Sequence, residues 1–235
     1  MTIGAVILSR YNSSRLPGKA LLKIGNKTVL ELIVERLLKV LEIGQIIIAT
    51  SDQHSDDPIA DFCEQIKINV FRGSLDNVAE RFYKAGSAFH WDYIIRINGD
   101  NIFADTLVLA NMVMIAQQDK YDFISNVKGR TFPKGMSIEI VRANYYNKML
   151  PNILVSEVYR EHVTLYLYEH EPIHHYYYLN TTIPQAAGIQ MALDTHEDFD
   201  RTKKIMRRFK KDHWNYNLQE IYSIWKQIEE HESTI

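Results

Sequence analysis

Short apolar runs alternate with longer amphipathic stretches through the first half of the chain. Residues 3–8, 45–50, 68–71 and 93–97 form apolar runs that end in polar residues, as is typical of buried parallel strands. Helices are predicted between them, over 28–41, 57–66 and 76–89, and after Asp105. This alternation predicts an α/β fold with a mostly parallel central sheet and helices on both faces.

Two of the predicted helices carry start signals. Thr28 followed by Glu31 matches a capping box, in which side chain and backbone satisfy each other's hydrogen bonds. Asp57 is predicted to be the N-cap of the next helix, with Pro58 as its first helical residue. These signals support the helices independently of their apolar spacing.

The second half of the chain is less regular. Strands are predicted at 137–141, 175–180 and 189–193. Helices are predicted at 157–169, 196–209 and 218–230. Because no internal repeat or interdomain linker is evident, we expect residues 1–235 to form one domain with a small protruding lobe.

The loop after the first predicted strand is the main candidate binding segment. Ligands of open parallel sheets bind beyond the carboxyl ends of the strands. Residues 9–19 lie there and carry Arg10, Arg15 and Lys19 with serines and a Pro-Gly turn, although they match neither common glycine-rich phosphate motif. Guanidinium groups pair with phosphate oxygens, and backbone N–H groups of a turn form an anion-binding nest. The loop indicates a triphosphate site; the alternative is a solvated surface loop.

Two aspartates are candidate metal ligands. Asp100 follows a glycine at the end of a predicted strand, and Asp194 ends another apolar run. Mg²⁺ binds one or two carboxylates together with waters and substrate phosphate oxygens, so these residues fit that ion. The alternatives are an ordinary turn residue for Asp100 and the N-cap of the following helix for Asp194.

Composition narrows the class of protein. Hydrophobic residues make up 46% and charged residues 24% of the 235 positions, as in ordinary globular proteins. A net charge of -2 argues against a nucleic-acid binder with a broad basic surface, and one cysteine excludes an intrachain disulfide. No apolar run approaches the roughly 20 residues that span a bilayer, and the N-terminus lacks signal-peptide features. We expect a cytoplasmic protein without membrane or nucleic-acid partners.

The binding segments resemble the signature of a known family. Residues 9–19, continuing to 35–37, are similar to the CMP-sugar synthetases, closest to the spore-coat-polysaccharide branch and related to the Kdo and acylneuraminate cytidylyltransferases. Further matching blocks follow in order at 48–51, 56–60, 70–74, 96–100, 131–135, 160–164 and 193–199. The chain departs from the family at Asn12, Ile102 and Ser137, where glycine, proline and an acidic residue are usual.

The resemblance implies a Rossmann-like nucleotidyltransferase fold, with 1–125 facing the nucleotide, 126–200 the acceptor, and C-terminal helices over 201–235. The implied nucleotide-binding residues are Leu8, Ser9, Arg10, Ser14, Arg15, Lys19, Ala49, Ser51, Arg72, Gly73, Ser74, Asn77 and Asn98. The implied acceptor-binding residues are Glu139, Arg160, His162 and Thr164. The alternatives are that Ser74 or Asp76 caps the next helix and that His162 is structural.

The expected reaction is attack by a sugar hydroxyl on the α-phosphorus of CTP, which forms a CMP-sugar for surface polysaccharide synthesis and releases pyrophosphate. Arg10, Arg15 and Lys19 would hold the triphosphate, Asp100 would hold Mg²⁺ with Asp194 as the candidate second ligand, and a nonulosonic acid is the leading acceptor. The alternatives are a nucleotide-sugar-dependent glycosyltransferase and a non-catalytic nucleotide-binding relative. Kinship also implies a homodimer, and the aromatic strand around 174–178 is interpreted as a subunit interface rather than a metal site.

Overall fold

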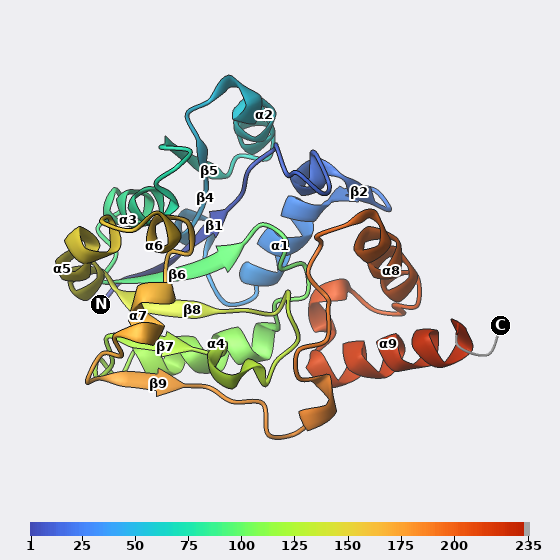
Figure 1. Ribbon diagram of the computed structural model, residues 1–235. Helices are drawn as coiled ribbons and strands as arrows, with labels where there is room; N and C mark the ends of the chain where they lie inside the picture. Colours follow the sequence, from blue (N-terminus) through green and yellow to red (C-terminus); the bar gives the residue numbers. More distant parts are fainter. Residues whose placement is uncertain (233–235) are drawn as a thin grey trace.

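The computed structural model of the chain describes residues 1–232 and centres on a seven-stranded sheet (Figure 1). Across the sheet the order is β5 (Asn69–Gly73), β4 (Ile46–Ser51), β1 (Ile3–Leu8), β6 (Tyr93–Asn98), β8 (Glu139–Arg142), β7 (Phe123–Ser125) and β9 (His175–Tyr177). Only β8 runs against its neighbours, β6 and β7. The mostly parallel sheet confirms the predicted fold class, and it places the ends of β1, β4 and β6 at one edge.

Helices cover both faces of this sheet. Because side chains alternate along a strand, Ala5 and Ile7 of β1 face one apolar core, whereas Val6 and Leu8 face the other. The first core is closed by α1 (Val29–Leu37), α2 (Asp57–Gln65), α4 (Thr106–Ala116), α8 (His196–Met206) and α9 (Leu218–Glu232). The second is closed by α3 (Val78–Ser87), α5 (Ala143–Ile153) and α7 (Leu165–Glu169), with α6 (Glu157–Glu161) beside α3. A short hairpin, β2 (Lys23–Ile24) and β3 (Lys27–Thr28), precedes α1.

The predicted helix starts are correct to within one residue. The Thr28 hydroxyl accepts the backbone N–H of Glu31 at 3.2 Å, and the Glu31 carboxylate accepts that of Thr28 at 2.6 Å. The capping box of α1 is therefore confirmed. The N-cap of α2 is Asp56 rather than Asp57, which is already helical.

Most of the wrong predictions of secondary structure lie in the second half of the chain. The segment 189–193 is not a strand, because its only pairing is a single bridge between Gln190 and Lys134. The helix predicted over 157–169 is broken into α6 and α7 at Val163, whose φ of 35° is left-handed. The Tyr146 hydroxyl donates to the Val163 carbonyl at 2.7 Å and fixes this bend. β7 and α5 were not predicted, since β7 has three residues and α5 contains Pro151.

The aromatic strand is shorter than predicted and lies at the edge of the sheet. β9 covers three of the residues expected over 175–180, and it pairs only with β7. Tyr176 and Tyr177 pack partly onto opposite faces of the sheet, as alternation along a strand requires. Its predicted role as a subunit interface stays a prediction. Among the described residues, no helix is long and apolar enough to cross a bilayer.

Candidate functional site

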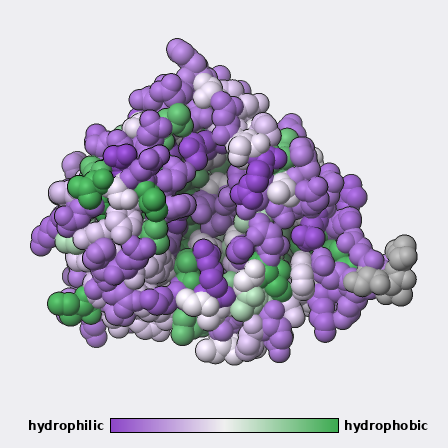
Figure 2. Space-filling model, in the orientation of Figure 1, coloured by the Kyte–Doolittle hydropathy of each residue, from purple (hydrophilic) through white to green (hydrophobic). Residues whose placement is uncertain are grey.

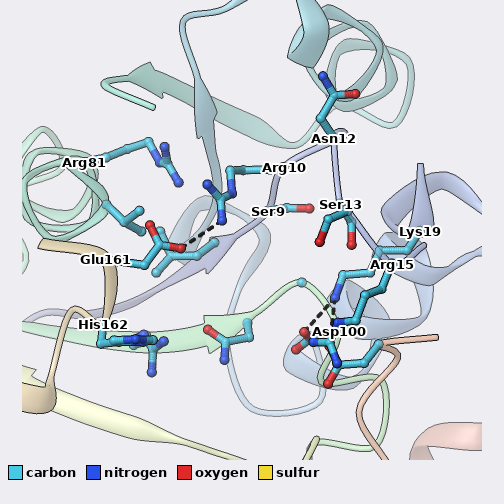
Figure 3. Close-up of a pocket in the computed structure, with 17 residues that line it drawn as sticks. Ser9, Arg10, Asn12, Ser13, Arg15, Lys19, Arg81, Asp100, Glu161 and His162 are labelled. Carbon is cyan, nitrogen blue, oxygen red and sulfur yellow. Dashed lines mark hydrogen bonds and ion pairs between the residues drawn. The ribbon is translucent and has the colours of Figure 1, made fainter. Parts of the chain in front are cut away.

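A polar cleft of about 510 Å³ opens at the carboxyl ends of β1 and β6. The loop after β1 forms one wall, and α6 with the first turn of α3 forms the other (Figure 3). Hydrophilic residues predominate on this hollowed face of the molecule (Figure 2). The predicted site residues in its lining are Leu8, Ser9, Arg10, Ser14, Arg15, Lys19, Asn98, Asp100, His162 and Asp194.

The two predicted metal ligands meet at one lysine. The Lys19 ammonium donates to the Asp100 carboxylate at 2.9 Å and to the Leu193 carbonyl at 2.8 Å, and it lies 3.5 Å from the Asp194 carboxylate. Arg15 forms an ion pair with Asp194 at 3.0 Å. Cations of the β1 loop and carboxylates from two distant segments thus share one end of the cleft.

Asp194 is free to face the cleft because another residue caps the helix after it. Thr195 is the N-cap of α8 and, with Asp198, forms a capping box. The alternative that Asp194 serves as the N-cap is therefore wrong. Its carboxylate instead contacts Lys19 and Arg15.

The backbone of the β1 loop has a fixed shape. Gly18 adopts a left-handed φ of 68°, which glycine accommodates without strain, and its N–H donates to the Tyr11 carbonyl at 2.8 Å. A short 3-10 turn then begins at Lys19, whose side chain extends into the cleft. The Pro-Gly turn read from the sequence therefore orients Lys19.

Asp56 ties this loop to the end of β4. The Asp56 carboxylate is buried and accepts the backbone N–H groups of Tyr11 at 2.7 Å and Ser51 at 2.9 Å, together with the Thr50 hydroxyl at 2.9 Å. Burial alone would raise the pKa of Asp56, but hydrogen bonds from Ser51, Tyr11 and Thr50 hold that pKa below its ordinary value. The ionised carboxylate therefore acts as a clamp on the loop.

The opposite wall carries a second group of charges. The Arg10 guanidinium pairs with Glu161 of α6 at 2.8 Å, which links the β1 loop to that wall (Figure 3). Arg81 of α3 and His162 also line this side. Figure 3 shows these side chains across the cleft from Lys19 and Asp100.

Comparison with known proteins assigns the family. The model of a family described as cytidylyltransferase matches residues 4–230. The chain belongs to the cytidylyltransferase family. It is therefore a nucleotidyltransferase, which confirms the sequence-based resemblance and decides against a glycosyltransferase.

Individual relatives match this cytidylyltransferase over most of its length. An uncharacterized protein of Methanocaldococcus jannaschii is 33% identical over 223 residues, which cover 94% of this chain and 89% of that protein. The spore coat polysaccharide biosynthesis protein SpsF of Bacillus subtilis is 31% identical over 210 residues, which cover 86% and 85% of the two chains. A solved cytidylyltransferase of Leptospira borgpetersenii has a TM-score of 0.88 at 27% identity, covering 98% of this chain and 96% of that one.

Several predicted nucleotide-binding residues lie outside the lining of the cleft. They are Ala49, Ser51, Arg72, Gly73, Ser74 and Asn77. The Arg72 guanidinium pairs with Asp57 at 2.6 Å and donates to the Ser51 carbonyl at 3.0 Å. The Ser74 hydroxyl accepts the backbone N–H of Asn77, the residue before α3, at 3.1 Å. These contacts order the loop after β5, and a role in holding the base and ribose stays a prediction for this cytidylyltransferase.

Of the predicted acceptor residues, only His162 lines the cleft. Glu139 is 2% exposed and accepts the Thr164 hydroxyl at 2.7 Å and the Tyr168 hydroxyl at 2.6 Å. It also forms a buried ion pair with Arg96, which does line the cleft. The polar groups of Glu139 and Thr164 are thus occupied beneath the surface, and their predicted contact with an acceptor stays a prediction.

Arg160 also turns away from the cleft in this cytidylyltransferase. Its guanidinium donates to the Leu154 carbonyl at 3.2 Å, which links α6 to the end of α5. Arg96 of β6 does line the cleft, and its side chain is anchored by Glu139. The predicted contact of Arg160 with an acceptor stays a prediction.

Sequence reasoning missed Arg81, Arg96 and Asp56 as parts of the site. A usable signal existed for Arg81, because it shares the buried face of α3 with Val78 and Phe82. A cation at such a position needs a polar partner or a ligand. Asp56 and Arg96 lay within blocks that match the family, but the hydrogen bonds that define them join segments far apart in sequence.

Proposed function

We propose that this cytidylyltransferase transfers CMP from CTP to an acidic sugar, with Mg²⁺ as cofactor and pyrophosphate as the second product. The observation that carries this proposal is the Lys19 ammonium held between Asp100 and Asp194 beside the β1 loop. A cation that can bind phosphate and two carboxylates that can bind a metal ion therefore lie at the same end of the cleft. This pairing suits transfer of a phosphoryl group from a nucleoside triphosphate.

The donor set fits Mg²⁺. This ion binds one or two protein carboxylates and completes its octahedron with waters and substrate phosphate oxygens. Asp100 and Asp194 supply that number, and among residues 1–232 no group of three or more acidic, histidine or cysteine side chains is arranged to hold a metal ion. When bound there, Mg²⁺ would neutralise phosphate charge.

The residues of the chain have distinct parts in the proposed reaction. A hydroxyl oxygen of the sugar forms a bond to the α-phosphorus and loses its proton to solvent. The bond from that phosphorus to the bridging oxygen of pyrophosphate breaks, and its electron pair leaves with the pyrophosphate. Lys19 and Arg15, released from their carboxylates, stabilise the charge that develops on the leaving pyrophosphate. Arg96 and His162 face the acceptor from the opposite wall.

Thermal shift and product release test this proposal. We expect a Mg²⁺-dependent rise in melting temperature that is larger with CTP than with UTP, ATP, GTP or CDP, followed by pyrophosphate release when sugar acids are added. Lys19→Met and Asp100→Asn should abolish turnover. The exposed residues Lys23 and Asp61 lie outside the cleft, so Lys23→Met and Asp61→Asn are matched controls that should retain activity. Normal turnover by Asp100→Asn, or a preference for another nucleotide, would contradict the proposal.

The biological setting follows from the same family. We propose a place in surface polysaccharide synthesis, supported by the similarity to the spore coat polysaccharide protein. The homodimer stays a prediction from the family resemblance. Light scattering at several protein concentrations should give twice the mass of one chain.

A further inference from the structure

Arg81 is a buried arginine without a carboxylate partner. It is 2% exposed, yet it lines the cleft. Its Nη1 donates to the Ser74 carbonyl at 2.6 Å, and its buried Nε has no hydrogen-bond partner within the described chain. Ion pairs within 4 Å join Arg10, Arg15 and Lys19 to carboxylates, whereas Arg81 has none among residues 1–232. A buried cation left unpaired is costly, so its retention calls for a ligand.

Comparison with Arg36, another fully buried arginine, separates a structural role from a ligand-binding one. The Arg36 guanidinium donates to three backbone carbonyls, those of Ala104, Tyr216 and His213. It lies in the core between α1 and the segment before α9, away from the cleft. The buried Nε of Arg36 also has no hydrogen-bond partner within the described chain, so the difference lies in the other two nitrogens. Those of Arg36 donate to three carbonyls, whereas those of Arg81 donate to one, and Arg81 lines the cleft.

Two carboxylates near Arg81, those of Asp56 and Glu161, are held by other partners. Asp56 accepts its three hydrogen bonds from the β1 loop and β4, and Glu161 pairs with Arg10. Figure 3 shows Arg81 and Arg10 on the same side of the cleft, across from Lys19 and Asp100. Neither of these carboxylates forms an ion pair with Arg81 within the described residues, so its free N–H groups remain available to a ligand in the cleft.

We infer that Arg81 anchors a second anion subsite, which receives an oxyanion of a bound substrate. The inference rests on the proposed function, because that reaction supplies two candidate groups: the α-phosphate of the nucleotide and the carboxylate of an acidic sugar. Both have the planar or tetrahedral oxygens that a guanidinium binds through paired hydrogen bonds. The subsite is distinct from the Lys19 end of the cleft, where the two metal-ligand carboxylates lie.

Binding measurements with Arg81→Gln test the inference. The probes are cytidine, CMP, CTP, N-acetylneuraminate and the methyl ester of N-acetylneuraminate. Loss of a hydrogen bond to a charged group weakens binding about tenfold to about a hundredfold. If the ligand is the α-phosphate, CMP and CTP lose this affinity and cytidine does not. If it is the carboxylate, N-acetylneuraminate loses affinity, whereas its ester and the nucleotides do not.

Two further variants guard against a purely structural explanation. Lys84→Gln removes a positive charge from the exposed side of the same helix and should bind every probe as the wild type does. Arg81→Lys keeps the charge with a single donor group and should bind the affected probe with intermediate affinity. Because Arg81→Gln removes an unpaired buried charge, its melting temperature without ligand should not fall.

The outcomes separate this inference from the proposed function. Unchanged affinity of Arg81→Gln for all probes, or an equal loss for cytidine and CMP, would overturn the anion subsite even when the wild type is active. Selective loss of CMP or sugar-acid binding would support it even when the wild type releases no pyrophosphate. A wild-type protein that binds none of the probes contradicts both proposals.

Discussion

Replacing Asp56 by asparagine should loosen the β1 loop and weaken nucleotide binding at the same time. The carboxylate holds Tyr11 through one oxygen, and Thr50 and Ser51 through the other. Asparagine has the same shape but only one acceptor oxygen. Its NH₂ group therefore replaces one of the two carboxylate oxygens and faces the N–H or O–H donors that this oxygen accepted. At best, therefore, one buried N–H group loses its acceptor, and the remaining bonds lose the assistance of a full charge.

The size of the effect follows from these contacts. A hydrogen bond to a charged group contributes about 1.5–3 kcal/mol, and a buried donor without an acceptor costs about 1–3 kcal/mol. We expect Asp56→Asn to lower the free energy of unfolding by about 2–4 kcal/mol, or about 5–15 °C in melting temperature for a chain of this size. Because Tyr11 also accepts the N–H of Gly18, the turn that aims Lys19 loosens as well, and CTP should bind about tenfold more weakly.

The adjacent residue provides a control with the same substitution. Asp57 pairs with Arg72 at the surface, and exposed ion pairs contribute little to stability. Urea unfolding of Asp56→Asn and Asp57→Asn should therefore diverge, with Asp57→Asn close to the wild type. CTP titration compares Asp56→Asn with Asp61→Asn, an exposed substitution on the same helix outside the cleft, which should bind CTP as the wild type does. Equal stability of the two variants would refute the clamp. A destabilised Asp56→Asn with unchanged CTP affinity would refute its link to the nucleotide.

Two further predictions concern stability away from the cleft. Arg36→Met should lower the free energy of unfolding by about 3 kcal/mol in urea, because three buried carbonyls lose their donor, and an unchanged midpoint would contradict this. Burial lowers the pKa of His213 below 6.5 despite its hydrogen bond to Glu35. As the pH falls, this histidine is therefore protonated at a higher pH in the unfolded chain than in the folded protein. The wild type should therefore lose more stability between about pH 7.5 and about pH 5.5 than His213→Gln does, and equal losses would exclude His213 as the cause.

Local patterns in the first half of the chain were enough to predict most of its elements. The capping box at Thr28 and Glu31, the apolar strands and the Pro-Gly turn each depend on neighbouring residues, and the structure confirms them. The same holds for the placement of Lys19 and Asp100, which the parallel sheet brings to one edge. The rule that ligands bind beyond the carboxyl ends of parallel strands therefore predicted this end of the cleft correctly.

The remaining features depend on contacts between distant segments. The bend at Val163 is fixed by the Tyr146 hydroxyl, so the apolar pattern of 157–169 still resembled one helix. Glu139 was assigned to the acceptor because of its place in the family pattern, but its burial against Arg96 depends on the pairing of β6 with β8. Neither effect is visible in the spacing of residues along the chain.

The charge pairs of the cleft explain why a triphosphate and a divalent cation would act together. Lys19 neutralises Asp100, and Arg15 neutralises Asp194, so each group holds its partner in place before any ligand arrives. A triphosphate alone would draw the two cations away and leave the carboxylates unpaired, whereas a divalent cation alone would leave the two cations unpaired. When both ligands bind, each cation can pair with phosphate oxygens and each carboxylate can pair with the divalent cation. Binding of the two ligands together is therefore favoured over binding of either one alone. Among residues 1–232 Arg81 forms no ion pair with a carboxylate, so binding of an oxyanion by Arg81 would break no existing ion pair.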